Sequence, residues 1–304
     1  MNIRDLSYII AVADTGHFGK AAEMCFVSQP TLSGQIKKLE ETLGVTIFER
    51  NNRHVEVTVV GEEIIAYARK ILSEVETIRS IAATYQDPLA GPLKIGAIPT
   101  LSPYLMPLIL SPIQKEYPQM KLILSEETTE QLLVRLKQHE IDAALLATDI
   151  EDPEFIAIPL FQEPFWVAYP RNHHFYNRDT ITTKDLDNEH LLLLAKGHCL
   201  ADQARSICQM ASNNEDNETA DIRASSLQTL IQLVSADYGI TLLPALAMGG
   251  SLMSGTGVVA QPLENNSASR TVSLVYRRSF PRTRALGAFS DLTRNNLPNT
   301  VQKL

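Results

Sequence analysis

The sequence predicts an α/β protein with an all-helical, winged helix-turn-helix domain at its N-terminus and two Rossmann-like lobes after it. Three observations predict this fold class. Two short helical patterns flank a tight turn within the first sixty residues, and a long Pro-free stretch of helical period follows. From Gly91 onward, strand and helix patterns alternate. At 304 residues with 44% hydrophobic composition, the chain is long enough for two or three domains.

The overall charge and the N-terminal residues argue against several classes of protein. The net charge of −8 disfavours a uniformly basic nucleic-acid-binding protein, so any DNA contacts must be gathered on one face. The N-terminal residues mix acids with apolar residues, unlike a signal peptide, and no apolar run approaches the roughly 18 residues of a membrane span. We therefore expect a cytoplasmic protein without membrane contacts, in which a cysteine bridge would be transient and regulatory.

Residues 1–58 are predicted to form the helix-turn-helix domain. Apolar residues recur at helical spacing over three segments, residues 4–15, 18–24 and 29–43. Ser28 is a candidate helix cap, and Pro30 is tolerated in the first turn of the third helix. This helix turns Ser33 and Lys37 outward, which suits a helix that enters the major groove of DNA.

The segment after Gly44 is predicted to form a wing of two short strands around Asn51 and Asn52. Such a wing would hold Arg50 and Arg53 over DNA phosphates. From the residues alone, a small helical bundle with a solvated polar face explains this part of the chain equally well.

Residues 59–87 are predicted to form a linker helix that dimerises. The stretch from Gly61 to Gln86 holds no Pro and no internal Gly. Its apolar residues recur in steps of four and three, as in the contact seam of a coiled coil, at Ile64, Ala68, Ile71, Val75 and Ile78. The alternative is a lone solvated helix, but a sustained seam favours a partner helix.

Residues 88–304 are predicted to form two lobes with mainly parallel sheets. We place lobe I at about 91–163 and 270–304 and lobe II at about 164–269, with a cleft between them as in periplasmic binding proteins. Sites in such sheets lie at the carboxyl ends of strands, which makes Thr100 and Thr129 candidates. Simple loop capping is the alternative for both. The strands predicted around lobe II are residues 155–160, 165–169, 191–194, 222–225 and 240–243.

Two of the three cysteines, Cys199 and Cys208, lie nine residues apart in the segment from Lys196 to Met210. If the segment is helical from about Leu200, the two cysteines are roughly 13 Å apart. A disulfide needs Cα atoms within about 7 Å, so bonding would first require unwinding. Cys25 lies on the packed side of the helical domain and is interpreted as a buried small residue.

The sequence contains no Gly-rich phosphate loop, HExxH or Gly-x-Ser-x-Gly motif, so no cofactor is expected. His173 and His174, together with His198 and Cys199, could suggest a metal site. Adjacent histidines in a polar loop usually face solvent, and we expect no metal here.

Several motifs resemble the LysR-type transcriptional regulators. They are Ala21-Ala22, Val27 to Ser33, Ile36 to Glu40, Leu43-Gly44 and Phe48-Glu49-Arg50. The resemblance implies that Gln29, Pro30, Thr31, Ser33 and Lys37 lie near DNA. Lys20 occupies, with Gly19, a position where relatives often carry two basic residues, so its phosphate contacts are expected to be weaker. The resemblance also implies promoter DNA, RNA polymerase and a homotetramer of two dimers as partners.

Within this family, the chain is similar to peroxide-sensing activators over nearly its whole length. The motif Gly197-His198-Cys199-Leu200, with Cys208, carries much of this similarity. It implies that Cys199 is the peroxide-reactive thiol and Cys208 the resolving thiol. The implied peroxide pocket comprises Thr100, Thr129, His198, Asp202 and Arg270.

The chemistry suits this interpretation, because a thiolate at a helix N-terminus beside a histidine is a good nucleophile. Attack on hydrogen peroxide gives a sulfenic acid that a second thiol converts to a disulfide, and cytosolic thiols later reduce it. The alternatives are a LysR-type regulator with an organic effector and a thiol peroxidase. A solute-binding protein is disfavoured by the N-terminal motif. We expect a regulator rather than an enzyme.

Overall fold

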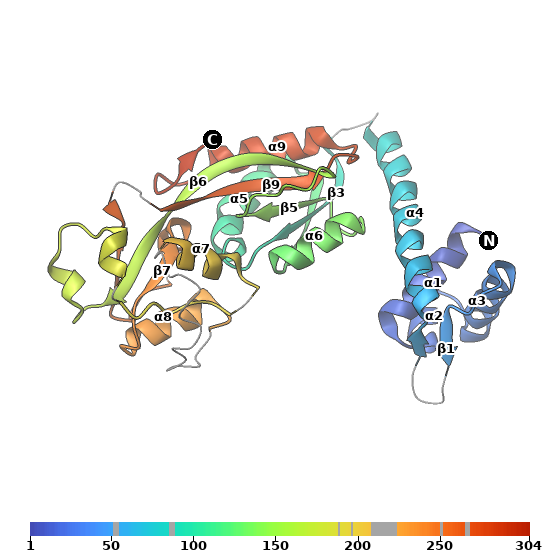
Figure 1. The fold of residues 1–304 in the computed structure, drawn as a ribbon. Coiled ribbons are helices and arrows are strands. Elements are labelled where there is room, and N and C mark those ends of the chain that lie inside the picture. The colour runs from blue at the N-terminus through green and yellow to red at the C-terminus, as the bar shows by residue number, and fades with distance from the viewer. Residues whose placement is uncertain are drawn as a thin grey trace. The chain divides into compact units, whose positions relative to one another are not determined.

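The structure, a computed structural model, describes residues 1–50, 55–84, 89–187, 189–195, 197–207, 224–249, 252–264 and 268–304. Residues 1–86 belong to one compact unit, and residues 87–136 with 141–304 form another (Figure 1). Within the described residues, no helix is both long and apolar enough to cross a membrane.

The first unit is the predicted winged helix-turn-helix. Its helices are α1 (Ile3–Thr15), α2 (Phe18–Met24) and α3 (Gln29–Leu43), and its wing strands β1 (Phe48–Arg50) and β2 (Val55–Val57) pair antiparallel. The Ser28 hydroxyl caps α3 by accepting from the Thr31 N–H, as predicted, and Pro30 lies in the first turn. Gly44 ends α3 in the left-handed conformation, at φ 71°. These caps set the two ends of α3, the helix whose exposed polar residues include Gln29, Thr31 and Lys37.

The linker helix α4 (Val59–Thr84) begins inside the first unit. Ala68 is buried in the core of the helical domain, and Ile64 packs against that core. Ile71 and Ile78 are instead 42% and 67% exposed. The predicted seam is therefore divided, because its N-terminal part packs within its own domain and only the part from Ile71 onward is open to a partner.

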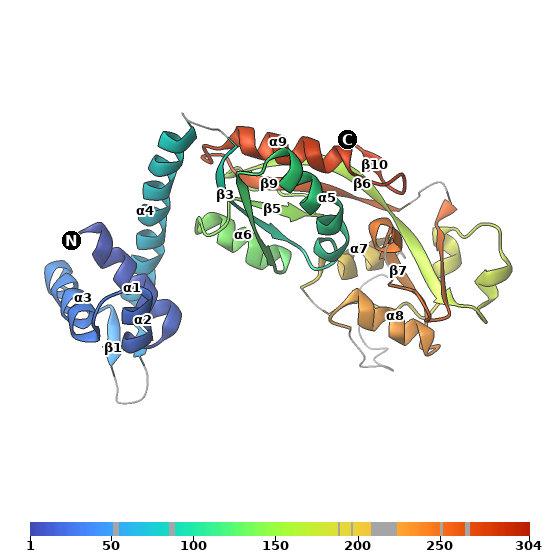
Figure 2. The same cartoon turned by 180° about the vertical axis from the view of Figure 1, so that it is seen from behind.

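Lobe I is built on parallel strands. The order along the chain is β3 (Gly91–Ala97), α5 (Ser102–Glu116), β4 (Met120–Glu126), α6 (Thr129–Lys137) and β5 (Ala143–Leu146). Strand β3 pairs in parallel with both β4 and β5. Because successive crossovers run in opposite directions along the sheet and are right-handed, α5 and α6 cover opposite faces (Figure 2). Helix α9 (Thr283–Asn295) packs beside α5.

One long strand joins the two lobes. β6 (Phe155–Pro170) pairs with β9 (Ser269–Arg277) and β10 (Gln302–Lys303) in the lobe I sheet. It then pairs with β7 (Thr241–Pro244) and β8 (Val258–Pro262) in lobe II. The change of partner comes at Pro164, the last β6 residue opposite β9. A proline suits this position because it lacks the N–H that an uninterrupted ladder would need.

Lobe II has its own apolar core, distinct from that of lobe I. Its further elements are η1 (His174–Asn177), η2 (Thr183–Leu186), α7 (Cys199–Ile207), α8 (Leu227–Ser235) and η4 (Ala245–Gly249). The lobe II core includes buried side chains of both α7 and α8. Helix α7 is the element that carries Cys199.

The prediction of mainly parallel sheets is confirmed for β4-β3-β5, and the isolated bridges of lobe II, Leu191 to Ile240 and Leu194 to Ala224, are also parallel. It is wrong for β5-β9, β9-β6 and the pairs of β6 with β7 and β8, which are antiparallel. The strands predicted over 155–160 and 165–169 form a single strand, since an irregularity after Pro159 absorbs the change in register. The predicted strand over 191–194 contributes only isolated bridges at Leu191 and Leu194. β8 and β10 were not predicted.

Candidate sensor site and DNA-binding face

Cys199 is the first residue of α7 and lies where the two lobes meet. Leu200, Ala201 and Ala204 of the same helix belong to the lobe II core. The half-buried Cys199 side chain instead packs against the core of lobe I. The helix therefore anchors itself in one lobe and presents its first side chain to the other.

Gln203 continues the same face of α7, one helical turn beyond Cys199. Its amide nitrogen donates a 2.6 Å hydrogen bond to the Ala147 carbonyl oxygen, just after β5 of lobe I. Its amide oxygen is buried and has no hydrogen-bond partner among the described residues. Gln203 thus ties α7 to lobe I and leaves one buried acceptor open.

Other buried hydroxyls lie at the carboxyl ends of the lobe I strands. They belong to Ser125 near the end of β4, Thr129 at the start of α6 and Thr148 beyond β5, and within the described part of the chain none has a hydrogen-bond partner. Buried polar atoms are nearly always satisfied in folded proteins, by protein groups or by ordered water. This edge of lobe I therefore offers partners to a small hydrogen-bonding ligand.

The turn before Cys199 lies close to these residues. Gly197 has φ +98°, a conformation that favours glycine, and a Cβ placed on it would lie 3.8 Å from the Thr128 methyl carbon. Thr128 immediately precedes Thr129. The geometry thus brings the Gly197–Cys199 turn beside the start of α6.

Thr100 and Arg270, both predicted site residues, are hydrogen-bonded to each other. Arg270 donates to the Thr100 hydroxyl at 3.0 Å and to the Thr100 carbonyl at 3.2 Å. The same guanidinium pairs with the fully buried Glu163, at 2.9 Å from Nε and 2.8 Å from Nη2. The other Glu163 oxygen accepts from the Leu246 N–H at 2.8 Å. The paired charges are therefore held among β6, β9, η4 and the loop that follows β3.

The remaining predicted site residues are placed differently. Asp202 is 83% exposed and pairs with Arg205 at 3.0 Å, so its carboxylate faces solvent in this conformation. His198 is half-buried directly before α7. Cys208 lies outside the described residues. Cys25 packs against the core of the helical domain as expected, and burial raises the pKa of its thiol.

Glu163 and Gln203 are absent from the predicted site. Glu163 had one signal, an acid between the largely apolar segments 155–161 and 165–169. A charged residue buried within a strand needs a partner, and here it is Arg270. Gln203 had a weaker signal, its spacing of one helical turn from Cys199.

Most of the candidate DNA contacts are exposed residues of α2 and α3. Lys20, Gln29, Pro30, Thr31 and Lys37 are exposed, and Ser33 is half-buried. The Thr31 hydroxyl is 2.8 Å from that of Ser28, so it takes part in the helix cap. Arg50 ends β1, and Arg53 lies outside the described residues.

Comparison with known proteins decides the family. Residues 3–62 match the bacterial regulatory helix-turn-helix protein, lysR family, and residues 86–298 match the LysR substrate binding domain. The chain belongs to the LysR family of transcriptional regulators. Its first unit is the DNA-binding domain of such a regulator, and its second unit is the LysR regulatory domain.

This LysR-family chain is similar to characterised relatives over its full length. It is 41% identical to a hydrogen peroxide-inducible genes activator of Dickeya chrysanthemi, covering all of this chain and 98% of the relative. A full-length OxyR variant from Pseudomonas aeruginosa superposes with a TM-score of 0.81 at 36% identity, covering 100% and 98% of the two chains. A mutant OxyR from Corynebacterium glutamicum with bound hydrogen peroxide gives 0.67 at 35% identity, covering 97% and 92%.

Proposed function

We propose that this LysR-family chain is a transcriptional activator that responds to hydrogen peroxide through oxidation of Cys199. One observation carries the proposal. Cys199 opens α7 at the junction of the lobes, beside a strand edge whose buried hydroxyls have no partner among the described residues. Hydrogen peroxide is small and both donates and accepts hydrogen bonds, so it suits such an edge. The names of the relatives support this choice of ligand.

In the proposed reaction, the Cys199 thiolate attacks one peroxide oxygen and the O–O bond breaks. The products are a Cys199 sulfenic acid and hydroxide. Donors aimed at the departing oxygen stabilise its charge, a role that fits Arg270 and the Thr100 and Thr129 hydroxyls. Condensation with the Cys208 thiol then releases water and forms a disulfide, which cytosolic thiols later reduce.

Helix α7 sets a geometric condition on that disulfide. From Cys199 to Ile207 the helix rises about 12 Å over eight residues. The next Cα lies about 3.8 Å further along the chain, so even a sharp reversal leaves Cys208 more than about 8 Å from Cys199. A disulfide needs about 7 Å or less. Oxidation must therefore unwind part of α7, which removes side chains such as Gln203 from their places between the lobes.

In the assembled regulator, linker helices pair through the part of α4 that begins at Ile71, and two dimers form a homotetramer. The dimer presents two copies of α3 to successive DNA half-sites, which suits a protein that recruits RNA polymerase at a promoter. Unwinding of α7 changes the lobe contacts and, through them, the spacing of the DNA-binding domains. The protein acts in the cytoplasm, where thiols reset the switch.

Three matched cysteine variants test the proposal. Cys199→Ser and Cys208→Ser should bind promoter DNA with normal affinity but lose peroxide-dependent transcription, whereas Cys25→Ser should respond normally. Peptide mapping after brief peroxide treatment should find Cys199 linked to Cys208. A fully responsive Cys199→Ser protein would contradict the proposal and favour an organic effector. Rapid peroxide turnover with a thiol reductant would instead favour a thiol peroxidase.

A further inference from the structure

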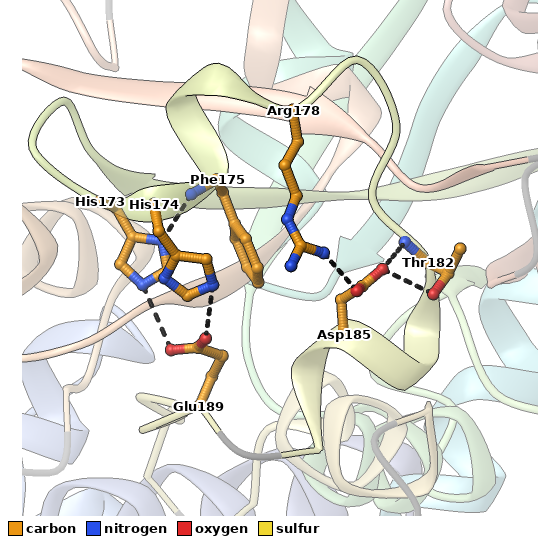
Figure 3. A network of polar contacts seen from close by, with 7 residues as sticks. All are labelled: His173, His174, Phe175, Arg178, Thr182, Asp185 and Glu189. Atoms are coloured by element: carbon orange, nitrogen blue, oxygen red, sulfur yellow. Dashed lines mark hydrogen bonds and ion pairs between the residues drawn. The ribbon is translucent and has the colours of Figure 1, made fainter.

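A cluster of metal-binding side chains lies in lobe II, apart from the sensor residues. His173 and His174 come at the start of η1, and Glu189 comes shortly after η2. Their ligand atoms all lie within 4.8 Å of one another. Figure 3 shows both imidazole rings directed at the same carboxylate. We propose that His173, His174 and Glu189 form a site for a first-row divalent metal ion, with Zn²⁺ as the ligand tested.

The distances fit the coordination geometry. Glu189 Oε2 lies 3.2 Å from His173 Nε2, and the other carboxylate oxygen, Oε1, lies 3.3 Å from His174 Nε2. Zinc bonds of about 2.0–2.1 Å in a tetrahedral arrangement place neighbouring ligand atoms about 3.3 Å apart. Each imidazole therefore has this separation from one oxygen of the carboxylate, and one ligand atom from each residue lies within 4.8 Å of the others. Rotation of the side chains is needed to bring the three ligand atoms to the spacing of one ion.

The chemistry of the donors fits zinc as well. Two imidazoles and one carboxylate are a donor set that holds zinc with a fourth position left for water. His173 and Glu189 are 15% and 17% exposed, whereas His174 is 56% exposed. His173 and Glu189 are therefore largely shielded from solvent, whereas an ion and its water can enter past the exposed His174.

Neighbouring side chains leave Glu189 available. The nearby cation Arg178 stacks over the Phe175 ring at 5.5 Å and pairs with Asp185, so it does not neutralise Glu189. Figure 3 shows the Phe175 ring between this ion pair and the histidines. The His173 ring is also held by Tyr169, at 5.7 Å between centroids. The rings of Tyr169 and Phe175 thus contact the His173 ring, and the positive charge of Arg178 is paired away from Glu189.

Metal binding carries one local cost. His173 Nδ1 accepts a 3.3 Å hydrogen bond from the Phe175 N–H. Coordination through Nε2 moves the ring proton to Nδ1, which can then no longer accept. The bond is long for its type, so its loss offsets only a small part of the gain from coordination. The amide signal of Phe175 should therefore shift when metal binds.

Zinc binding to the reduced, metal-free, full-length protein tests the proposal, with calorimetric stoichiometry as the readout. His174→Ala and Glu189→Gln remove ligands, and His190→Ala is the matched control because it removes an exposed neighbouring imidazole outside the cluster. The wild type and His190→Ala should bind one zinc equivalent more than the other two variants, or bind it at least tenfold more tightly. Cobalt should occupy this equivalent without thiolate charge-transfer absorption.

Cysteines can also bind zinc, so the cobalt spectrum separates the two locations. Equal zinc binding by the wild type, His174→Ala and Glu189→Gln would overturn the proposal. So would a wild-type protein whose bound metal shows only thiolate ligation, or one that retains no zinc at micromolar free metal. Because the readout is metal binding, failure here leaves the Cys199 proposal untouched, and failure of peroxide sensing leaves this site untouched.

Discussion

Arg270 donates a 3.0 Å hydrogen bond to the hydroxyl of Thr100, which lies 170 residues earlier in the chain. Both side chains are buried, and Arg270 is balanced by the fully buried Glu163. A guanidinium held in this way can keep one orientation while it stabilises negative charge beside Thr100. The orientation depends on Glu163 as much as on Arg270 itself.

Replacing Glu163 with Gln should therefore destabilise the regulatory domain. Removing one partner of a buried ion pair leaves the other charge uncompensated, which costs about 3 kcal/mol or more. Urea unfolding of the purified protein measures the loss. Glu151→Gln is the control, because Glu151 is exposed and its replacement should change the free energy of unfolding by less than about 0.5 kcal/mol. Equal stability of the two variants would show that the pair is not energetically important.

Asp142 should make stability depend on pH. Burial raises the pKa of its carboxyl, and this outweighs the 2.8 Å hydrogen bond from the Lys94 N–H and the nearby positive charges. The folded state then holds the proton more tightly than the unfolded state does. Its contribution to stability is present below the unfolded pKa, near 3.8, and is lost as pH rises through the folded pKa.

Asp142→Asn keeps an oxygen for the Lys94 N–H but removes the charge. We expect a higher free energy of unfolding than the wild type at pH 7, with the difference shrinking as pH approaches 4. Urea titrations at several pH values check this trend, with the exposed Asp149→Asn as control. A variant that is less stable than the wild type at pH 7 would contradict the expected direction of the pKa shift.

Gly239 is required where the chain turns into β7. Its φ is +149°, and a Cβ there would lie 2.3 Å from the His190 carbonyl oxygen, which accepts from the Ile240 N–H. Gly239→Ala should therefore cost about 1–3 kcal/mol, measured by thermal unfolding. Gly249→Ala, where a Cβ meets nothing within 4 Å, should be nearly neutral. Equal melting temperatures for the two variants would refute the expectation.

Lys37 should contribute one phosphate contact to DNA binding. It is exposed on α3, and its contact with Glu41 is long, at 4.0 Å. Lys37→Gln should weaken binding to all sequences alike and lower the slope of log affinity against log salt by about 1. Fluorescence anisotropy over a salt series gives that slope. Lys115→Gln, exposed in the regulatory domain, should leave it unchanged.

Local signals allowed much of the fold to be predicted. Ser28, Pro30 and Gly44 mark the ends of α3, because capping and proline geometry act within a few residues. The direction of strand pairing is set by contacts far along the chain. The antiparallel return of β9 between β5 and β6 therefore could not be predicted from local patterns.

The residues of the candidate site also divide into those that local sequence predicts and those that depend on distant contacts. Cys199 and Thr100 could be named from motifs and from the ends of predicted elements. Glu163 is part of the site because it pairs with Arg270, 107 residues away in the sequence. Gln203 is part of it because it donates a hydrogen bond to Ala147, 56 residues away. His173 and His174 were expected to face solvent. Their convergence on Glu189 depends on a loop that local sequence does not specify.

The shared strand β6 also limits how the lobes can move. Its ladder with β9 ends at Pro164 and its ladders with β7 and β8 begin at the next two residues, so movement that keeps these ladders intact must take place about this junction. Rotation about the strand axis preserves them. β4 lies four strands from β6, or about 19 Å, so a rotation of about 10° displaces it by about 3 Å. A small twist of β6 thereby becomes a movement of about two carbon–carbon bond lengths at the outer edge of lobe I.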